Sequence, residues 1–210
     1  MFSWKSRAST IGSYSTSVLG GLVIVLALSS YILTPPSSIL DVTLTANSLV
    51  KLHQYRRVGG DGALFYFDLK TDLKPLFHWN LKMVYVYLSA EYKTQRNEIN
   101  QVVLWDTIVE REELNHTRKE AKKHGQLRRR PIYHTKGVLD LEDLKCKYIL
   151  LDDGFNLRNQ NVTFKLNWNI VPNAGLMFDQ IHPKTTSMVL PSTYIKARRD
   201  QDYSAEDEIN

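Results

Sequence analysis

The feature that most limits what this chain can fold into is a long uncharged segment close to its N-terminus. From Ala8 through Leu40 there is no Asp, Glu, Lys or Arg, and the stretch from Val18 to Leu33 is almost wholly apolar. About 20 residues cross a hydrocarbon core at a helical rise of ~1.5 Å each, so Ile11 to Leu33 is long enough to span a membrane. Pro35 and Pro36 cannot continue a helix. We therefore predict a transmembrane signal anchor at residues 11–34.

Basic residues flank this segment unevenly, and this asymmetry predicts its orientation. Lys5 and Arg7 precede it, whereas the first basic residue after it is Lys51. Positive charge tends to stay in the cytosol, so we expect a cytosolic N-terminus at residues 1–10 and a large domain across the membrane. A cleavable signal peptide is the alternative, because Ala27 and Ser29 form a small-x-small cleavage pattern. The apolar run continues beyond that pattern, which favours a retained anchor.

In the rest of the chain, apolar and polar residues alternate with a period of two, which is typical of β-strands. With 210 residues and 43% hydrophobic composition, there is room for one domain with a core of its own in addition to the anchor. The candidate strands are Asp41–Thr45, Leu64–Leu69, Met83–Tyr92, Val102–Val109, Tyr148–Leu151, Asn161–Val171 and Ser187–Leu190. We predict an all-β lumenal domain at residues 35–197, an antiparallel β-sandwich, joined to one N-terminal transmembrane helix.

Three segments interrupt the strand pattern. Leu73–Asn80 is expected to contain a helical turn that places Phe77 and Trp79 under the sheet. Residues 110–136 form a basic insertion that includes Arg128–Arg130, and residues 198–210 are expected to be a disordered tail. A solvated loop explains the basic run, and the predicted topology excludes nucleic acid as its partner. Anionic lipid head groups or an acidic patch on a neighbouring subunit would suit it better.

A search for catalytic and metal-binding patterns identifies no reaction centre. The six histidines share no metal-ligand spacing, and the single cysteine, Cys146, is expected to pack in the core. Ser48 and Lys51 match the S-x-x-K pattern of Ser-Lys hydrolases, but this pattern is short enough to occur by chance in many chains, and a plain strand explains these residues. We therefore expect no catalytic residue, no cofactor and no metal site.

Two tripeptides have the N-glycosylation pattern, Asn115-His-Thr117 and Asn161-Val-Thr163. Both lie in the part of the chain that is placed across the membrane. They agree with the predicted topology.

Several blocks of sequence together resemble signal peptidase complex subunit 3, the glycosylated accessory subunit of the eukaryotic microsomal signal peptidase. In chain order they are Trp79–Tyr92 (WNLKMVYVYLSAEY), Asn100–Asp106 (NQVVLWD), Lys147–Tyr148, Asp152–Gly154, Asn161–Thr163 and Trp168–Gly175 (WNIVPNAG). The resemblance covers nearly the whole chain, with the N-terminal anchor in place. In this family the sequon aligns with Asn161, whereas Asn115 lies in the basic insertion.

The resemblance implies a protein of the endoplasmic reticulum membrane whose lumenal domain packs against the catalytic subunit of signal peptidase and assembles with the small membrane subunits. It implies a non-catalytic accessory role, because the catalytic serine belongs to another chain, with only indirect contact to signal-peptide-bearing precursors. Two other hypotheses stay open: a lumenal module that binds nascent or glycosylated cargo, and a membrane-anchored hydrolase that uses Ser48 and Lys51.

Overall fold

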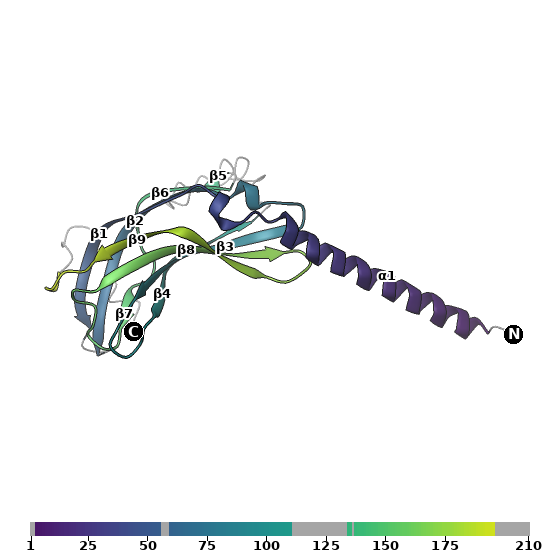
Figure 1. Ribbon diagram of the computed structural model, residues 1–210, viewed down its shortest axis with the longest axis horizontal. Helices are drawn as coiled ribbons and strands as arrows, with labels where there is room; N and C mark the ends of the chain where they lie inside the picture. The colour runs from purple at the N-terminus through teal and green to yellow at the C-terminus, as the bar shows by residue number, and fades with distance from the viewer. Residues whose placement is uncertain (1–2, 56–58, 111–133, 136, 196–210) are drawn as a thin grey trace, which may run out of the picture.

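A computed structural model shows one long helix extending from the end of a two-sheet β-domain (Figure 1). The structure describes residues 3–55, 59–110, 134–135 and 137–195. Most of the predicted basic insertion, the sequon at Asn115 and the predicted tail therefore lie outside the described residues.

Helix α1 spans Trp4–Leu33, so it begins about two turns before the predicted membrane span. Ser3 caps it by accepting a hydrogen bond from the Ser6 amide at 3.3 Å. In the serine-rich part, the Thr16 hydroxyl donates to the Gly12 carbonyl at 2.9 Å, which keeps this polar side chain satisfied within the helix. The helix is long and apolar enough to cross a membrane and ends just before the two prolines, as predicted.

All strand pairings in the described chain are antiparallel and form two sheets, which confirms the predicted β-sandwich class. The first sheet has the order β1-β2-β6-β5, with β7 pairing with β2; its strands are β1 (Val42–Tyr55), β2 (Gly60–Asp72), β5 (His134–Thr135), β6 (Val138–Lys145) and β7 (Leu150–Asp152). The second sheet has the order β4-β3-β8-β9; its strands are β3 (Leu81–Tyr92), β4 (Asn100–Glu110), β8 (Asn161–Pro172) and β9 (Phe178–Val189).

The core lies between the two sheets, where alternate side chains of each strand meet. Phe65 of β2 meets Phe164 of β8 edge to face, with ring centroids 5.1 Å apart, and Phe67 meets Trp105 of β4 at 5.7 Å. Trp168 is completely buried in the same core. Cys146 is buried too, as its predicted packing role requires.

Several strands differ from the sequence prediction: β1 and β2 are longer than predicted, and β5 lies within the predicted basic insertion. β6 was not predicted, and β9 is far longer than the predicted Ser187–Leu190. β9 contains Pro183 and pairs only with β8 in the sheet, so it is an edge strand, where a missing backbone N–H is tolerated.

The connection between β2 and β3 contains the expected helical turn, η2 (Lys74–Leu76). Phe77 packs against the core, but Trp79 is 51% exposed. The prediction that Trp79 tucks under the sheet is therefore wrong.

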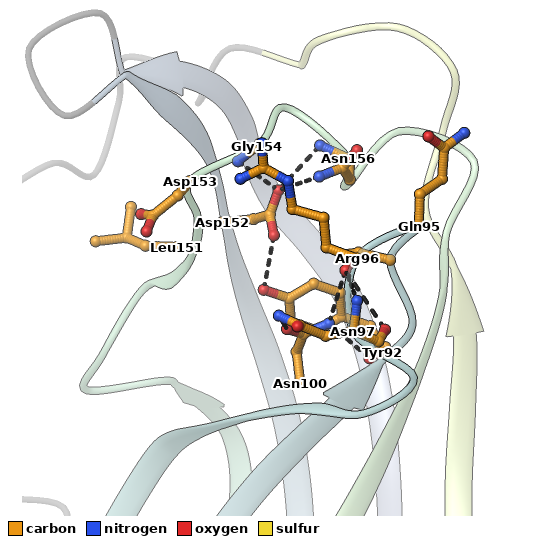
Figure 2. A pocket seen from close by; sticks show the side chains of 11 residues that line it. Tyr92, Gln95, Arg96, Asn97, Asn100, Leu151, Asp152, Asp153, Gly154 and Asn156 are labelled. Atoms are coloured by element: carbon orange, nitrogen blue, oxygen red, sulfur yellow. Dashed lines mark hydrogen bonds between the residues drawn. The ribbon is translucent and has the colours of Figure 1, made fainter.

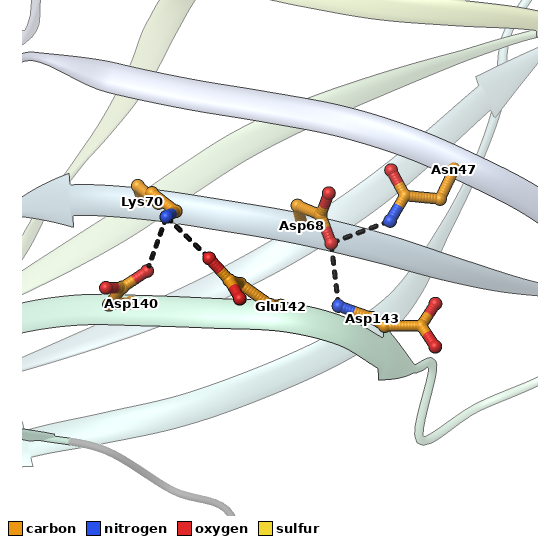
Figure 3. Close-up of polar contacts among 6 residues, drawn as sticks. All are labelled: Asn47, Asp68, Lys70, Asp140, Glu142 and Asp143. Carbon is orange, nitrogen blue, oxygen red and sulfur yellow. Dashed lines mark hydrogen bonds and ion pairs between the residues drawn. The ribbon is translucent and has the colours of Figure 1, made fainter.

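The outer face of the first sheet is polar and solvated (Figure 3). Lys70 of β2 contacts Asp140 at 3.2 Å and Glu142 at 2.7 Å, both on β6. The Asp68 carboxylate accepts a hydrogen bond at 2.7 Å from the amide of Asp143, which adopts a left-handed conformation with φ of 48°. Exposed ion pairs of this kind add little stability, so their main effect is to make this face hydrophilic.

Candidate functional site at the junction of helix and sheet

The most constrained polar cluster among the described residues is where α1 meets the second sheet, and Asn80 lies at its centre. Asn80 is 2% exposed and immediately precedes β3. Its Nδ2 donates to the Ala174 carbonyl at 2.8 Å and to the Ser30 hydroxyl, and its Oδ1 accepts from the Ala174 amide at 3.2 Å. One side chain therefore joins α1, the β8–β9 loop and the start of β3.

A second contact secures the end of the helix. The Thr34 hydroxyl donates to the Ser30 carbonyl at 2.7 Å and lies 3.4 Å from Nε2 of His78. Nδ1 of His78 accepts from the Asn80 amide at 3.3 Å. This arrangement requires the proton of a neutral His78 ring to be on Nε2, where it can be donated to Thr34.

The segment between helix and β1 is docked onto β9 and is not a free tether. Gln180 donates from Nε2 to the Pro35 carbonyl at 3.2 Å, while its Oε1 accepts from the indole N–H of Trp168 at 3.0 Å. Further along, Nε2 of the buried His182 lies 3.2 Å from the Leu40 carbonyl. Because Nδ1 of His182 accepts from the backbone N–H of Lys184, Nε2 carries the proton and donates to Leu40.

These contacts connect α1 to the hydrophobic core. Trp168 is in the core, Gln180 bonds to it, and Pro35 follows the helix within two residues. Packed side chains and buried hydrogen bonds hold their partners in one geometry, since an unpaired buried polar group is costly. The β-domain is therefore held in a fixed orientation relative to the helix axis.

The outer face of the second sheet is chemically different from that of the first. Tyr85 and Tyr87 stack there with centroids 5.5 Å apart, and their register partners include Ile108, which is 47% exposed. The Oδ1 atoms of Asn167 and Asn169 have no hydrogen-bond donor within the described residues. These two oxygens are themselves buried, so it is the aromatic and aliphatic surface around Tyr85, Tyr87 and Ile108 that is typical of a protein-binding face.

A carboxylate organises one border of this face. Asp106 of β4 accepts hydrogen bonds from Lys147 at 2.9 Å and from the hydroxyl of Tyr148 at 3.3 Å. Tyr85 donates to the other carboxylate oxygen at 3.4 Å, and burial followed by the charge of Asp106 raises the pKa of Tyr85. Four residues of the blocks named above, Tyr85, Asp106, Lys147 and Tyr148, thus meet in one cluster.

A hollow of about 450 Å³ lies at the opposite end of the domain, between the β3–β4 and β7–β8 loops (Figure 2). Asp152 lies at its base and accepts hydrogen bonds at 3.0 Å from the amides of Gly154 and Asn156 and from the hydroxyl of Tyr92. Burial, with a smaller contribution from the Asp152 charge, raises the pKa of Tyr92. The Asp152 carboxylate thus stabilises the turn that follows β7, and within the described residues no cluster of His, Cys, Asp and Glu could hold a metal ion.

The predicted glycosylation residue Asn161 is the first residue of β8, and its side chain is exposed. It lies at the end of β8 away from the helix, because the other end, Pro172, adjoins the junction. A strand of 12 residues is about 36 Å long from first to last residue, so Asn161 is far from the junction with α1. The side chain of Asn161 is therefore accessible to solvent.

The residues suggested for hydrolysis do not form a site. Ser48 is exposed on β1, and Nζ of Lys51 lies 5.8 Å from the ring centroid of Tyr55. No hydrogen bond joins Ser48 to Lys51 in the described part of the chain. The geometry thus gives no support to a Ser-Lys centre.

Sequence reasoning missed the junction residues Ser30, Asn80, Gln180 and His182. The sequence offered only a weak signal for them, because Asn80, Gln180 and His182 do not form a recognisable motif. Asn80 and Ala174 both lie within the blocks that carried the resemblance, which is the one hint that they matter.

Comparison with known proteins agrees with the resemblance. A family described as "Signal peptidase subunit" matches residues 1–128 and 132–193. The chain is similar to signal peptidase complex subunit 3 of chicken, with 35% identity over 90% of this chain and 94% of the relative. It is 40% identical to the Caenorhabditis elegans protein of the same name over 66% of each chain, and 39% identical to the human one over 66% of this chain and 65% of the relative. The nematode and human alignments thus span just under two thirds of those relatives.

Proposed function

The chain belongs to the signal peptidase complex subunit 3 family, and from this premise we propose that it is a non-catalytic subunit that holds the catalytic subunit at a fixed height above the membrane. Membership makes it a subunit of the signal peptidase complex and indicates the endoplasmic reticulum membrane as its location. Its non-catalytic role, its partner and its orientation are the proposal.

The junction around Asn80 is the observation that carries this proposal. A protease that cuts at a membrane surface needs its active site at a constant depth, and preorganisation by a rigid neighbour supplies this. The helix of this chain cannot swing relative to its β-domain without breaking the partly buried hydrogen bonds of Asn80 and Gln180. A partner that binds the domain is thereby held in register with the bilayer.

The outer face of the second sheet is the surface proposed to contact the catalytic subunit. It combines the stacked Tyr85 and Tyr87 with the exposed Ile108 and Ile181, which are 47% and 55% exposed. The strands of this sheet run roughly along the direction of the helix axis, so the face stands upright on the membrane (Figure 1). The first sheet offers a charged face instead, which is less suited to a dry contact.

We propose an orientation with the N-terminus in the cytosol and the β-domain in the lumen. Lys5 and Arg7 before the helix support it by the distribution of positive charge. The exposed position of Asn161, far from the helix, supports a lumenal glycan there.

Affinity isolation of the full chain in mild detergent, followed by a signal-peptide cleavage assay, tests the function. We expect a serine-type membrane protease to copurify and the activity to survive Ser48→Ala. An active protein isolated alone, with activity lost in Ser48→Ala, would overturn the non-catalytic role in favour of the hydrolase. Binding of nascent or glycosylated cargo in the absence of any protease subunit would instead favour the cargo module.

Charge substitutions test the proposed face separately. Ile108→Glu together with Ile181→Glu should reduce copurification of the protease, because both side chains would bring a charge into an apolar contact. Lys70→Glu on the outer face of the first sheet is the matched control, since it changes an exposed residue without touching the proposed contact. Loss of the protease with Lys70→Glu but not with the isoleucine variants would assign the contact to the other sheet.

A further inference from the structure

The loop between β8 and β9 lies beside the membrane helix, not at its end. A Cβ atom placed on Gly175 would be 3.2 Å from the Cα of Ala27, so the loop backbone touches the helix there. Figure 1 shows this hairpin running alongside the part of α1 nearest the domain. Ala27 precedes the helix end at Leu33 by six residues, or about 9 Å along the axis.

This contact occurs at a depth where the helix is inside the bilayer. A span of about 20 residues that contains the whole apolar run from Val18 to Leu33 must contain Ala27 as well. The loop beside Ala27 therefore reaches below the end of the span. It approaches the boundary between lipid head groups and acyl chains.

The loop has the side chains that such a position requires. Leu176 and Met177 are consecutive, and they are 86% and 64% exposed. There is no charged residue from Ile170 through Phe178, and Trp79, next to Asn80 in the chain, is 51% exposed. Two large apolar side chains at a hairpin tip, with an aromatic ring nearby, match the composition of membrane-interface segments.

The backbone of Asn173 and Ala174, just before the tip, is already paired in part, which lowers the cost of moving the loop out of water. The Ala174 amide and carbonyl both bond to the Asn80 side chain, and the Asn173 amide donates to the Asn80 carbonyl at 2.7 Å. An irregular loop can enter the edge of a bilayer when its backbone groups are satisfied by protein. Asn80 thus joins the loop to the helix and also shields its polar groups.

We propose that the β8–β9 loop inserts Leu176 and Met177 into the membrane leaflet on the side of the β-domain, with Trp79 at the level of the lipid head groups. The domain then touches the bilayer at a second point beside its helix. Two points of attachment fix the tilt of the domain as well as its height. The inference needs only a membrane-spanning helix and does not rest on which protein the second sheet binds.

Spin labels in the full chain, reconstituted in phosphatidylcholine nanodiscs, test this inference. Leu176→Cys places a label at the tip, and Ile99→Cys is the matched control, because Ile99 is a similarly exposed apolar residue, 70% exposed, in the loop at the opposite end of the sheet. Leu28→Cys supplies a reference inside the lipid. The native Cys146 is buried and is replaced by Ala in all variants.

The measurement is the accessibility of each label to oxygen, which concentrates in lipid, relative to a water-soluble nickel chelate. We expect this ratio to be above one at positions 176 and 28 and below one at 99. A ratio at 176 equal to that at 99 overturns the proposal. It is also overturned if 176 is water-accessible in the isolated chain and becomes shielded only when the other subunits are added, since the occupant is then a protein.

Discussion

Substituting Asn80 by Ala tests whether the junction between α1 and the β-domain is rigid. The change removes two direct hydrogen bonds to Ala174, at 2.8 and 3.2 Å, and the bond to the Ser30 hydroxyl. Each net bond contributes about 1 kcal/mol, and a buried partner left unpaired costs about 1–3 kcal/mol. Because Asn80 and Ser30 are 2% and 1% exposed, water cannot readily replace the lost amide. We expect Asn80→Ala to lower the free energy of unfolding by about 3 kcal/mol.

Thermal unfolding of the full chain in nanodiscs measures this loss. A domain of this size changes its melting temperature by about 2–4 °C per kcal/mol, so Asn80→Ala should lower it by about 6–12 °C. Proteinase K should also cut faster between Leu33 and Asp41, since this segment would detach from β9 more often. Asn97→Ala is the control, because Asn97 is an exposed amide on the β3–β4 loop.

The Ser30 hydroxyl provides the decisive comparison. Ser30→Ala should lower the free energy of unfolding less than Asn80→Ala does, because the hydrogen bonds to Ala174 remain. The two substitutions together should lower it by less than the sum of their separate effects, since they share one hydrogen bond. A melting temperature for Asn80→Ala within about 2 °C of the unmodified chain, with unchanged proteolysis of the linker, would refute a rigid junction.

Other predictions address the glycan and two buried groups. Asn161→Gln should abolish the mobility shift that endoglycosidase H removes, and a shift that persists until Asn115→Gln is added would assign a second glycan to the basic insertion. Burial raises the pKa of the Cys146 thiol to about 12, so maleimide should label Cys146 at pH 8 only after unfolding; rapid labelling of the folded chain would contradict its burial. The pKa of Tyr92 is raised by burial and then by Asp152, so the folded state retains a proton that the unfolded state releases above about pH 10, and stability should fall as the pH rises past that value. Tyr92→Phe should flatten this fall in denaturant titrations, and an unchanged pH profile would argue against a contribution from Tyr92.

Local patterns in the sequence were sufficient for the helix and most strands. The uncharged run up to Leu33 and the prolines after it predict α1 and its end, because helix formation in lipid depends on composition alone over that length. Alternation from Met83 to Tyr92 and from Asn161 to Val171 predicts two strands that both pack on the core. These two strands were predictable because each has one buried and one exposed face.

β6 and β9 show where local patterns fail. Leu139 and Leu141 do alternate with acidic residues, but Asp143, with its left-handed backbone, interrupts the alternation. The basic segment that precedes β6 in the sequence also favours the prediction of a loop. In β9 the run around Pro183 is polar because the strand is at an edge and much of it is exposed. Such strands are specified by their partners more than by their own composition.

The junction could not be derived from the sequence for a different reason. Asn80 is 50 residues from Ser30 and 94 from Ala174, so its role depends on how three separate elements come together. A buried polar residue acquires its role from tertiary contacts, and nothing within its own segment distinguishes it from the asparagine of an ordinary turn.

The docking of the helix linker onto β9 also sets an order of events during synthesis. Pro35 and Leu40 find their partners, Gln180 and His182, 145 and 142 residues later in the chain. While a ribosome is still making the first strands, the newly inserted helix has no domain to hold, because β9 is the last strand to emerge. Helix α1 is thus the first element made and the last to be locked in place. A chain cut short before Phe178 would insert normally and lack these contacts from β9.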